Sequence, residues 1–292
     1  MKNFLVVTGG AGFVGSNLIK HLINKTDFKI ISIDNYSSGN RYNHINSKRI
    51  KYINGTTLNI EKILKNYKTK IHTLFHFGEF SRIYQSFESL DACLETNSIS
   101  SNSVFKFCLK NKIKLVYSAT SSSLGNKGFD KNLSPYSFTK SKNLELLDNL
   151  KKWFNFKFEV IYFYNVYGPG QISKGKMATV IGIFENHYKD KKPLPVVKPG
   201  SQTRRFTHIQ DSIDTVYFAW KQNKCKHYAI TSKKSWTVLE VAKMFGGKIK
   251  YLPPRKGERY ASALTKMSLT NKVEKRYGKI SLKDYIKSIV SK

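Results

Sequence analysis

The stretch of sequence that decides the fold is FLVVTGGAGFVG, residues 4–15. It opens with an apolar run that predicts a buried β-strand, and residues 13–24 have the periodicity of a helix. Between strand and helix, glycines stand in the pattern G-x-x-G-x-x-G. Gly9 permits a tight turn, Gly12 lets the backbone approach a pyrophosphate, and Gly15 lets the helix pack closely on the strand. Because the first turn of such a helix offers free N–H groups to phosphates, we expect this turn to bind a dinucleotide.

An acidic residue follows at the position where such a site needs one. Asp34 ends the second expected strand, residues 29–33, and comes 19 residues after Gly15. A carboxylate there accepts hydrogen bonds from both hydroxyls of the adenosine ribose and repels a 2′-phosphate. The pattern therefore favours NAD over NADP as cofactor. The alternative, a glycine-rich turn without a ligand, leaves both the strand–turn–helix context and the acid unexplained.

Short apolar runs alternate with longer amphipathic segments over the first 170 residues. We expect further strands at 51–53, 73–77, 114–118 and 159–164, and helices at 98–111 and 136–154. Strands alternating with helices of this length predict βαβ units and a parallel sheet. The expected fold class is α/β: a Rossmann-type doubly wound parallel sheet with a smaller C-terminal α/β substrate-binding region.

The expected domain division follows a change in the sequence pattern after Gly168, where turns rich in Gly and Pro replace the regular alternation of strands and helices. Residues 1–170 form the NAD-binding Rossmann domain, and segments near 206–232 return to it. Residues 171–205 and 233–292 form the smaller region, in which residues 178–189 read as a helix between turns rich in Gly and Pro.

The charge of the chain is strongly positive, with 51 Lys plus Arg against 19 Asp plus Glu and a net charge of +32. Such a charge suggests a nucleic-acid partner. However, 43 of these residues are Lys and only 8 are Arg, and the lysines are spread along the whole chain. Arginine is the residue suited to bidentate readout of phosphate and guanine, so we favour a solvated lysine surface and no nucleic-acid partner. A basic nucleic-acid-binding protein that lost catalysis stays open as an alternative of another class.

Other classes are excluded by composition. Three widely spaced cysteines without a C-x-x-C pair argue against a disulfide scaffold and a zinc site, and the histidines show no metal-binding spacing, so we expect no metal. There is no apolar stretch of about 18 residues, so no membrane span is expected. We expect a cytoplasmic protein.

A candidate catalytic pair lies in YSFTK, residues 136–140. On a helix, Tyr136 and Lys140 lie on one face, one turn apart. A phenol is a poor base at pH 7, and a nearby ammonium lowers its pKa. The expected strand at 114–118 leads into Thr120, whose hydroxyl can bind a substrate oxygen beside the phenol. Parallel sheets bind ligands at such carboxyl ends.

These motifs together resemble the extended branch of the short-chain dehydrogenase/reductase family, whose members act on nucleotide sugars. The likeness covers nearly the whole chain. Beyond the glycine turn, Asp34, Thr120 and the Tyr136/Lys140 pair, it rests on YNVYGPG at 164–170, GSQTRRFTHIQD at 200–211 and RKGE at 255–258.

The resemblance implies an NAD-dependent nucleotide-sugar 4-epimerase that works by transient hydride transfer through a 4-keto intermediate. Tyr136 takes the proton of the sugar 4-hydroxyl, Thr120 hydrogen-bonds that oxygen, and Lys140 lowers the tyrosine pKa and holds the nicotinamide ribose. The 4,6-dehydratases of the family carry an acid pair where this chain has Ser121 and Ser122. Elimination of water needs an acid, which serine does not supply at pH 7, so the pattern favours a 4-epimerase over a dehydratase.

Further positions are implied individually. For the cofactor they are Phe13, Val14, Asn35, Phe77, Gly78, Glu79, Asn97 and Ser118. For the substrate, a nucleotide-diphosphate sugar and most simply a UDP-sugar, they are Asn165, Arg204, Phe206, Arg255 and Glu258. Arginine suits a diphosphate because its planar fork donates two hydrogen bonds. A homodimer through helices 98–111 and 136–154 is also implied.

Glu79 departs from the family pattern, because small residues are common at its position. It could serve as the acid missing at Ser122. This keeps a dehydratase, or an epimerase acting at several positions, open.

Overall fold

The computed structural model of the chain describes residues 2–124, 132–255 and 273–291. Its centre is a sheet of eight strands in the order β14-β11-β6-β5-β4-β1-β2-β3, and every pairing in it is parallel. The strands are β1 (Phe4–Thr8), β2 (Lys29–Asp34), β3 (Ile50–Asn54), β4 (Ile71–His76), β5 (Lys114–Thr120), β6 (Phe158–Phe163), β11 (His227–Thr231) and β14 (Val273–Tyr277). The chain starts inside the sheet at β1, adds β2 and β3 on one side, and then adds the other strands on the opposite side. This confirms the doubly wound α/β fold.

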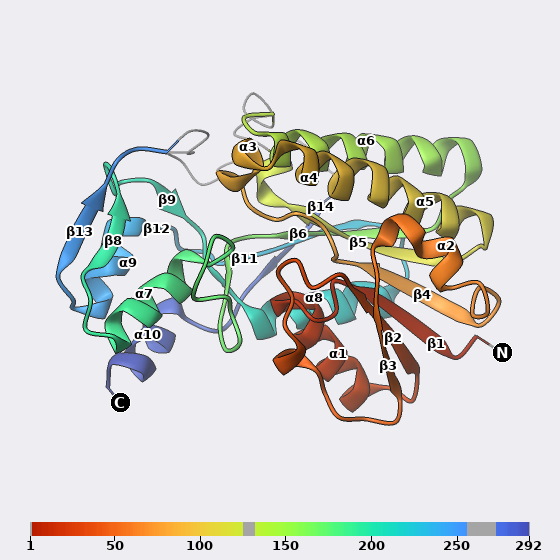
Figure 1. The fold of residues 1–292 in the computed structure, drawn as a ribbon, viewed down its shortest axis with the longest axis horizontal. Coiled ribbons are helices and arrows are strands. Elements are labelled where there is room, and N and C mark those ends of the chain that lie inside the picture. The colour runs from red at the N-terminus through yellow and green to blue at the C-terminus, as the bar shows by residue number, and fades with distance from the viewer. Residues whose placement is uncertain (1, 125–131, 256–272, 292) are drawn as a thin grey trace.

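Helices cover both faces of this sheet (Figure 1). One face carries α1 (Phe13–Lys25) and α8 (Ile209–Gln222), and the other carries α5 (Ser101–Lys110) and α6 (Pro135–Phe154). Short helical segments α2 (Ile60–Ile63), α3 (Gln85–Glu88) and α4 (Leu90–Leu94) connect the elements of the first half.

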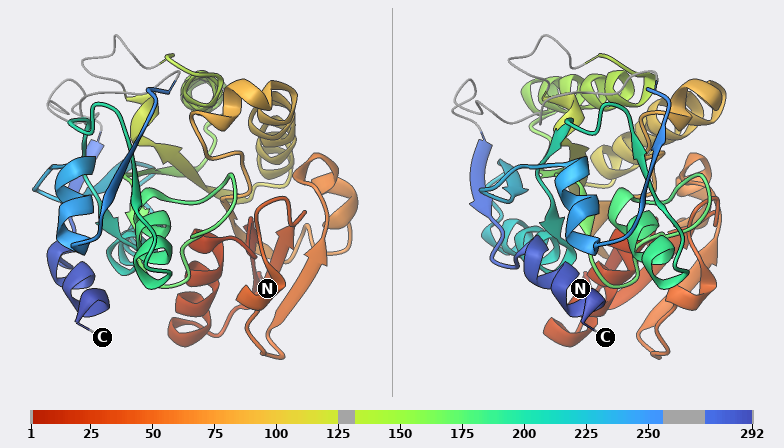
Figure 2. Two further views of the ribbon diagram at one scale, coloured as in Figure 1. Left: turned by 60° about the vertical axis from the view of Figure 1, so that its left-hand side comes forward. Right: turned by 90° about the vertical axis from the view of Figure 1, so that its left-hand side faces the viewer.

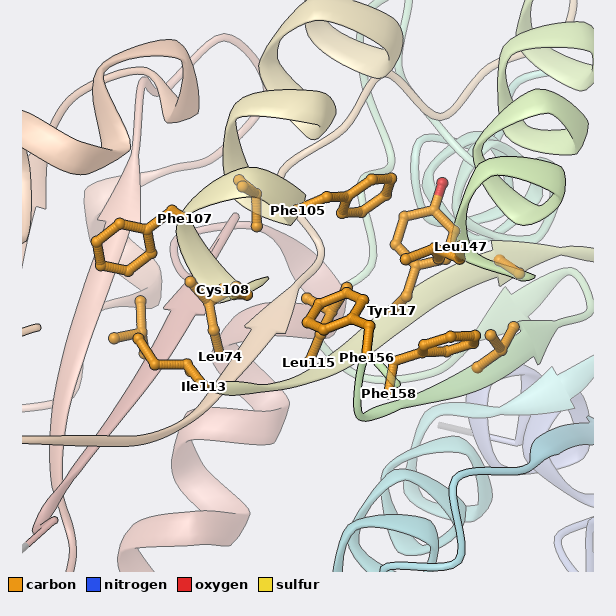
Figure 3. Close-up of a cluster of buried hydrophobic side chains, with 14 of the residues drawn as sticks. Leu74, Phe105, Phe107, Cys108, Ile113, Leu115, Tyr117, Leu147, Phe156 and Phe158 are labelled. Carbon is orange, nitrogen blue, oxygen red and sulfur yellow. The ribbon is translucent and has the colours of Figure 1, made fainter. Parts of the chain in front are cut away.

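Each face of the sheet has its own hydrophobic core. Figure 3 shows part of the core under α5 and α6, where Phe105 and Leu147 from the helices meet Leu115, Tyr117 and Phe158 from the strands. These side chains are essentially inaccessible to water. Their burial supplies the main stabilisation of the sheet, at about 25 cal/mol for each Å² of apolar surface removed from water.

A third core belongs to a smaller group of elements at one side of the molecule, as Figures 1 and 2 show. Here α7 (Val180–Lys189) and α9 (Val238–Phe245) pack around the ladder of β8 (Leu194–Val197) with β13 (Ile249–Leu252), and α10 (Leu282–Val290) packs on α9. Phe184 from α7 and Phe245 from α9 meet edge to face at its centre.

The structure differs from the sequence expectation at three places. Strand β14 belongs to the main sheet beside β11, although residues 233–292 were expected in the smaller region. Residues 207–208, expected near the sheet, form β10 (Thr207–His208) and pair with β7 (Val166–Tyr167) in a separate ladder. The helix expected at 98–111 begins with a π-helical turn, Glu95–Ser100, before α5.

None of the helices in the described part of the chain combines the length and the apolar composition that a bilayer crossing requires. The same residues contain no group of three or more His, Cys, Asp or Glu side chains placed to hold a metal ion. All three cysteines are free thiols.

Candidate active site

A cavity of about 910 Å³ runs along the carboxyl ends of the sheet strands to the smaller group of elements. The glycine turn and Asp34 line it, as do Tyr136 and the arginines at 204 and 255. The other expected residues that line it are Phe13, Val14, Asn35, Phe77, Gly78, Glu79, Ser118, Thr120, Lys140, Asn165 and Phe206. Asn97 does not line it, and Glu258 lies outside the described residues.

The glycine turn leaves room for a ligand only on the side that faces the cavity. Gly9 has a φ of +69°, and a Cβ on it would lie 2.7 Å from the backbone nitrogen of Gly78. A Cβ on Gly15 would lie 2.1 Å from the carbonyl oxygen of Gly9. Gly12 is the N-cap residue of α1 and carries no side-chain cap, so the first amides of the helix stay available. This arrangement fits a pyrophosphate at the helix N-terminus.

Asp34 completes the fit to NAD. The residue is 9% exposed, and its carboxylate accepts hydrogen bonds from the backbone N–H groups of Ala11 at 2.9 Å and Tyr36 at 2.8 Å. A carboxylate has about four acceptor positions, so two remain for the hydroxyls of a ribose. The two backbone contacts fix the carboxylate at the end of β2, facing the cavity.

Tyr136 and Thr120 meet in the middle of the cavity wall. Ser134 caps α6 by accepting from the backbone N–H of Ser137 at 3.1 Å, and Pro135 occupies the first turn. Tyr136 follows in that turn, and its side chain hydrogen-bonds that of Thr120 at the end of β5. The last residues of the strand and the first turn of the helix therefore hold the two hydroxyls together.

The pKa of Tyr136 is raised to about 12. Burial is the main cause, and the negative charge of Glu79 adds to it. The hydrogen bond from Thr120 and the charge of Arg82 act in the opposite direction. Lys140, which was expected to lower this pKa, is ion-paired with Glu79, so its effect on the phenol stays a prediction.

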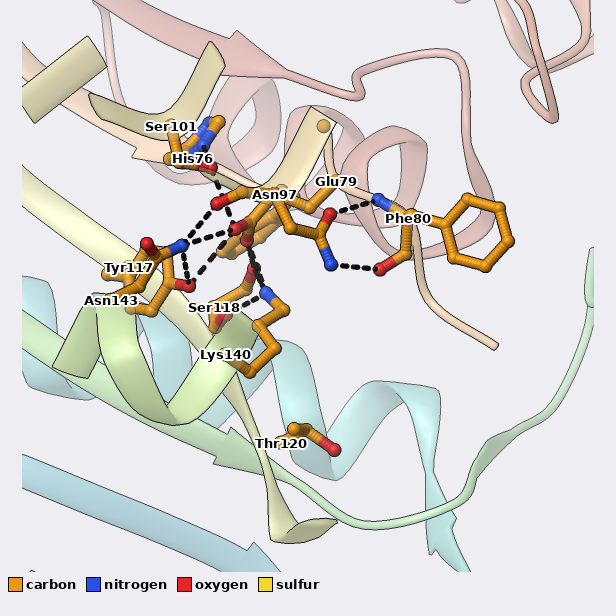
Figure 4. A network of polar contacts seen from close by, with 12 residues as sticks. His76, Glu79, Phe80, Asn97, Ser101, Tyr117, Ser118, Thr120, Lys140 and Asn143 are labelled. Atoms are coloured by element: carbon orange, nitrogen blue, oxygen red, sulfur yellow. Dashed lines mark hydrogen bonds and ion pairs between the residues drawn. The ribbon is translucent and has the colours of Figure 1, made fainter. Parts of the chain in front are cut away.

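Lys140 forms an ion pair with Glu79, as Figure 4 shows. The side chains of Glu79 and Lys140 are 2% and 5% exposed. The ammonium also donates to the carbonyl oxygen of Ser118 at 2.6 Å and lies 4.8 Å from the ring centre of Tyr117. An ammonium has three donor hydrogens, and beyond these two bonds it makes a longer contact of 3.5 Å with Oγ of Ser118.

Asn97 acts on the protein backbone. Its amide oxygen accepts from the N–H of Phe80 at 2.7 Å, and its nitrogen donates to the carbonyl oxygen of Phe80 at 3.1 Å and to Thr139 at 3.2 Å. It therefore clamps the loop after β4, where a contact with the cofactor was expected. This role follows from the fold and has no local sequence signal.

The far end of the cavity carries the residues expected to bind the substrate. Arg204 is held by a hydrogen bond to the carbonyl oxygen of Thr203 at 2.8 Å, and Phe206 is buried. Arg255 lies over the ring of Tyr84, 5.5 Å from its centre. Asn165 donates to the carbonyl oxygen of Arg205 at 3.0 Å, which makes it a backbone contact here.

Arg82 was missed by the sequence analysis. It lines the cavity and donates to the carbonyl oxygen of Met177 at 3.0 Å. Its positive charge lowers the pKa of Tyr136. No motif marks it. The scarcity of arginine in the chain is the signal that could have identified it.

Comparison with known proteins agrees with this geometry. A model of the NAD dependent epimerase/dehydratase family matches residues 5–231. An ADP-L-glycero-D-manno-heptose-6-epimerase from Brachyspira hyodysenteriae is 28% identical over 254 residues, which cover 82% of this chain and 79% of the relative.

Solved structures show the same fold over nearly the whole chain. A UDP-glucose 4-epimerase from Thermotoga maritima, solved with UDP-glucose, has a TM-score of 0.86 and 22% identity and covers 99% of this chain and 97% of its own. DesIV from Streptomyces venezuelae, a dTDP-glucose 4,6-dehydratase solved with NAD, has a TM-score of 0.86 and 19% identity, with 99% and 96% covered. The match of the family model over most of the chain, on a cavity built for NAD, shows that this protein belongs to the NAD-dependent epimerase/dehydratase family.

Proposed function

We propose that this enzyme is a nucleotide-sugar epimerase that inverts carbon 4 of the sugar. The observation that carries the proposal is the composition of the wall around Tyr136. The wall offers a phenol and a threonine hydroxyl to a sugar oxygen. Among the described residues, the carboxylate that affects the pKa of this phenol is that of Glu79, and it is ion-paired with Lys140. NAD, the cofactor of the family, supplies a reversible hydride acceptor when it is bound.

The residues of the chain divide the remaining work. Tyr136 removes the proton from the sugar hydroxyl and returns it, and Thr120 holds the same oxygen through a hydrogen bond. The glycine turn and Asp34 hold the cofactor, with Ser118 and Lys140 beside its nicotinamide ribose. Arg204 and Arg255 would bind the diphosphate of the substrate, because their planar guanidinium groups match phosphate oxygens.

Dehydration is less well supported, because elimination needs an acid beside the leaving hydroxyl. Glu79 was the candidate for that role. Its carboxylate is ion-paired with Lys140 and accepts further hydrogen bonds from Ser101 and Tyr117, so its oxygens are already committed to partners within the protein. Such a carboxylate does not protonate a leaving group.

A second candidate function is epimerization at carbon 6 of an ADP-heptose. The likeness to the heptose 6-epimerase of B. hyodysenteriae favours it. The same Tyr136 and Thr120 would serve, since inversion at either carbon begins with removal of a hydroxyl proton.

The two candidates are separated by their products. The purified enzyme with NAD would be incubated with UDP-glucose, UDP-N-acetylglucosamine, dTDP-glucose and ADP-glycero-manno-heptose, and each mixture would be analysed by NMR and mass spectrometry. Conversion of a hexose to its 4-epimer at unchanged mass supports the proposal. Conversion of the heptose alone establishes the second candidate, and a product lighter by one water establishes a dehydratase.

The basic surface leaves one alternative of another class to test. A protein that kept the fold and binds nucleic acid would show affinity for DNA or RNA that falls steeply with salt. We expect turnover of a nucleotide sugar and no such affinity. In our proposal the net charge of +32 steers anionic substrates toward the cavity.

We also propose that the enzyme is a homodimer through the helices at 95–110 and α6. These helices carry exposed apolar side chains, among them Ile99, Phe138, Trp153 and Phe154. Burying such a surface against a second copy would remove it from water. Light scattering coupled to gel filtration would measure the mass, and a monomer at micromolar concentration contradicts this proposal.

A further inference from the structure

Glu79 is a buried carboxylate at the active site, and the proposed reaction leaves it without a role. It lies just after β4, and its Oε1 accepts hydrogen bonds from Ser101 at 2.9 Å, Tyr117 at 3.0 Å and Asn143 at 3.3 Å. Its Oε2 faces Lys140 and Ser118. Figure 4 shows these partners converging on the carboxylate from α5, β5 and α6.

This set of donors orients the Glu79 carboxylate toward the ammonium of Lys140. The pair with Lys140 is shielded from water, because both side chains are at most 5% exposed. In such surroundings the charges act on neighbouring groups with little screening.

We propose that Glu79 is a positioning residue of the reaction: it holds the ammonium of Lys140 beside Ser118 and offsets its charge, so that Tyr136 exchanges protons over a more alkaline pH range than Lys140 alone would give. The proposal rests on the proposed function in one respect, the role of Tyr136 in proton transfer. It concerns only residues of this chain.

Among the other charged and titratable groups around Tyr136, Cys93 acts in the same direction as Glu79, but only as a thiolate. Arg82, on the loop after β4, lowers the pKa of Tyr136, whereas Glu79 raises it. Cys93 on α4 is a buried thiol that stays protonated, because burial raises its pKa. His76 at the end of β4 is neutral, because burial lowers its pKa to about 4. Tyr117 on β5 stays protonated, since burial raises its pKa as well.

The proposal predicts the direction in which the titration of Tyr136 moves when the negative charge of Glu79 is removed. In Glu79→Gln the Glu79–Lys140 pair goes from neutral to positive as long as Lys140 stays protonated. A positive neighbour favours the phenolate. If Lys140 loses its proton instead, the pair stays neutral but the negative neighbour of Tyr136 is still gone. The titration of Tyr136 therefore moves to lower pH.

The experiment measures the pH dependence of kcat/KM for the wild type, Glu79→Gln and Glu145→Gln, with NAD and the nucleotide sugar that is turned over. We expect the acidic limb of the profile to move down by about one pH unit in Glu79→Gln. Glu145→Gln removes an exposed carboxylate from the same helix that carries Lys140 and should leave the limb in place. An unchanged limb in Glu79→Gln, or a limb at higher pH, overturns the proposal.

A second readout does not depend on turnover. The phenolate absorbance of each protein minus that of its Tyr136→Phe counterpart isolates the titration of this one tyrosine. It should occur at lower pH in Glu79→Gln than in the wild type, and equal titrations overturn the proposal. If no nucleotide sugar is converted at all, the proposed function fails while this titration still decides the inference.

A third variant covers the case in which Glu79→Gln does not fold. Lys140→Met leaves the buried charge of Glu79 uncompensated, so the titration of Tyr136 should move to higher pH than in the wild type. The double variant Lys140→Met/Glu79→Gln removes both charges and should return the titration toward the wild-type position. A double variant that titrates like Lys140→Met overturns the proposal.

Discussion

The two ends of strand β5 each carry a buried Glu–Lys pair, and the two pairs are built differently. At the amino end, Lys114 donates to Glu159 at 3.2 Å, with side chains 10% and 0% exposed. At the carboxyl end, Lys140 pairs with Glu79 next to Ser118. Both pairs are well shielded from water, so burial alone does not tell them apart.

The two pairs differ in the other hydrogen bonds that each carboxylate accepts. Glu159 accepts from the backbone N–H groups of Cys225 at 2.9 Å and Lys226 at 2.7 Å, and so ties β6 to the turn before β11. Glu79 accepts from side-chain hydroxyls and an amide, and it lines the cavity. A carboxylate bonded to backbone amides holds the fold together, whereas one surrounded by side chains at the carboxyl end of a parallel sheet can act on a ligand. The same pair of residue types therefore serves stability at one end and chemistry at the other.

The sharpest test of this contrast is Tyr136→Phe at the carboxyl end. Removing the phenol hydroxyl removes the proton-transfer group, so kcat/KM should fall by about 10²–10⁴-fold. The free energy of unfolding should change by no more than about 1 kcal/mol, because only the hydrogen bond to Thr120 is lost. Turnover assays and urea unfolding of the same preparations measure both quantities. Normal activity in this variant would refute the mechanism.

Glu159→Gln at the amino end should give the opposite result. The amide cannot accept from both backbone N–H groups, and Lys114 loses its counter-charge, so unfolding should become easier by about 3 kcal/mol. Lys114 keeps contacts with Asn223 at 2.7 Å and the carbonyl oxygen of Trp220 at 3.3 Å, which limits the loss. At temperatures where the variant is folded, kcat/KM should equal that of the wild type. The exposed Glu145→Gln is the matched control and should change stability by less than about 0.5 kcal/mol. Equal stabilities for these two variants would remove the contrast.

A smaller effect on stability is expected from His76, at the same end of the sheet as Glu79. Its ring lies between Thr8 at 2.7 Å and Ser101 at 3.0 Å, and burial lowers its pKa to about 4. The unfolded chain binds a proton near pH 6.5 and the folded protein only near pH 4. Stability is therefore complete above pH 6.5 and falls as the pH drops toward 4, by roughly 2–3 kcal/mol. Unfolding curves of the wild type and His76→Gln across this range test it: the His76→Gln curve should be flatter, and parallel curves would contradict the assignment.

The parts of the fold that the sequence predicted depend on local patterns. Strand β1, the glycine turn and α1 follow one another within 25 residues, and apolar runs mark the central strands. Strand β14 reads VEKRY and lies at the outside of the sheet, so it lacks an apolar run. The pairing of β10 with β7 joins segments about 40 residues apart, and no local pattern reports such a pairing.

In the candidate site, too, the features that follow from local spacing could be predicted, and those that depend on the tertiary structure could not. The spacing of Tyr136 and Lys140 on one helix face predicted where both side chains lie. What Lys140 contacts could not be predicted, because the donors around Glu79 come from separate elements that only the sheet brings together. The sequence marked Glu79 as an unusual residue for its position without showing which way its carboxylate points.

The smallest effect is expected at Asp34, which lies at the same edge of the sheet as Glu79 but at the end of β2. Asp34→Asn keeps an acceptor for one backbone N–H and loses the negative charge that we expect to bind the ribose hydroxyls. We expect NAD to bind about tenfold more weakly, since a hydrogen bond to a charged group contributes about 1.5 kcal/mol or more. Calorimetry with NAD and NADP would measure the loss, and the preference for NAD over NADP should shrink because the 2′-phosphate is no longer repelled. Unchanged affinity for both would show that the carboxylate serves only Ala11 and Tyr36, as Glu159 serves Cys225 and Lys226. Asp34 would then belong with the carboxylates that hold the fold, and position at the carboxyl end of the sheet would not by itself indicate a binding role.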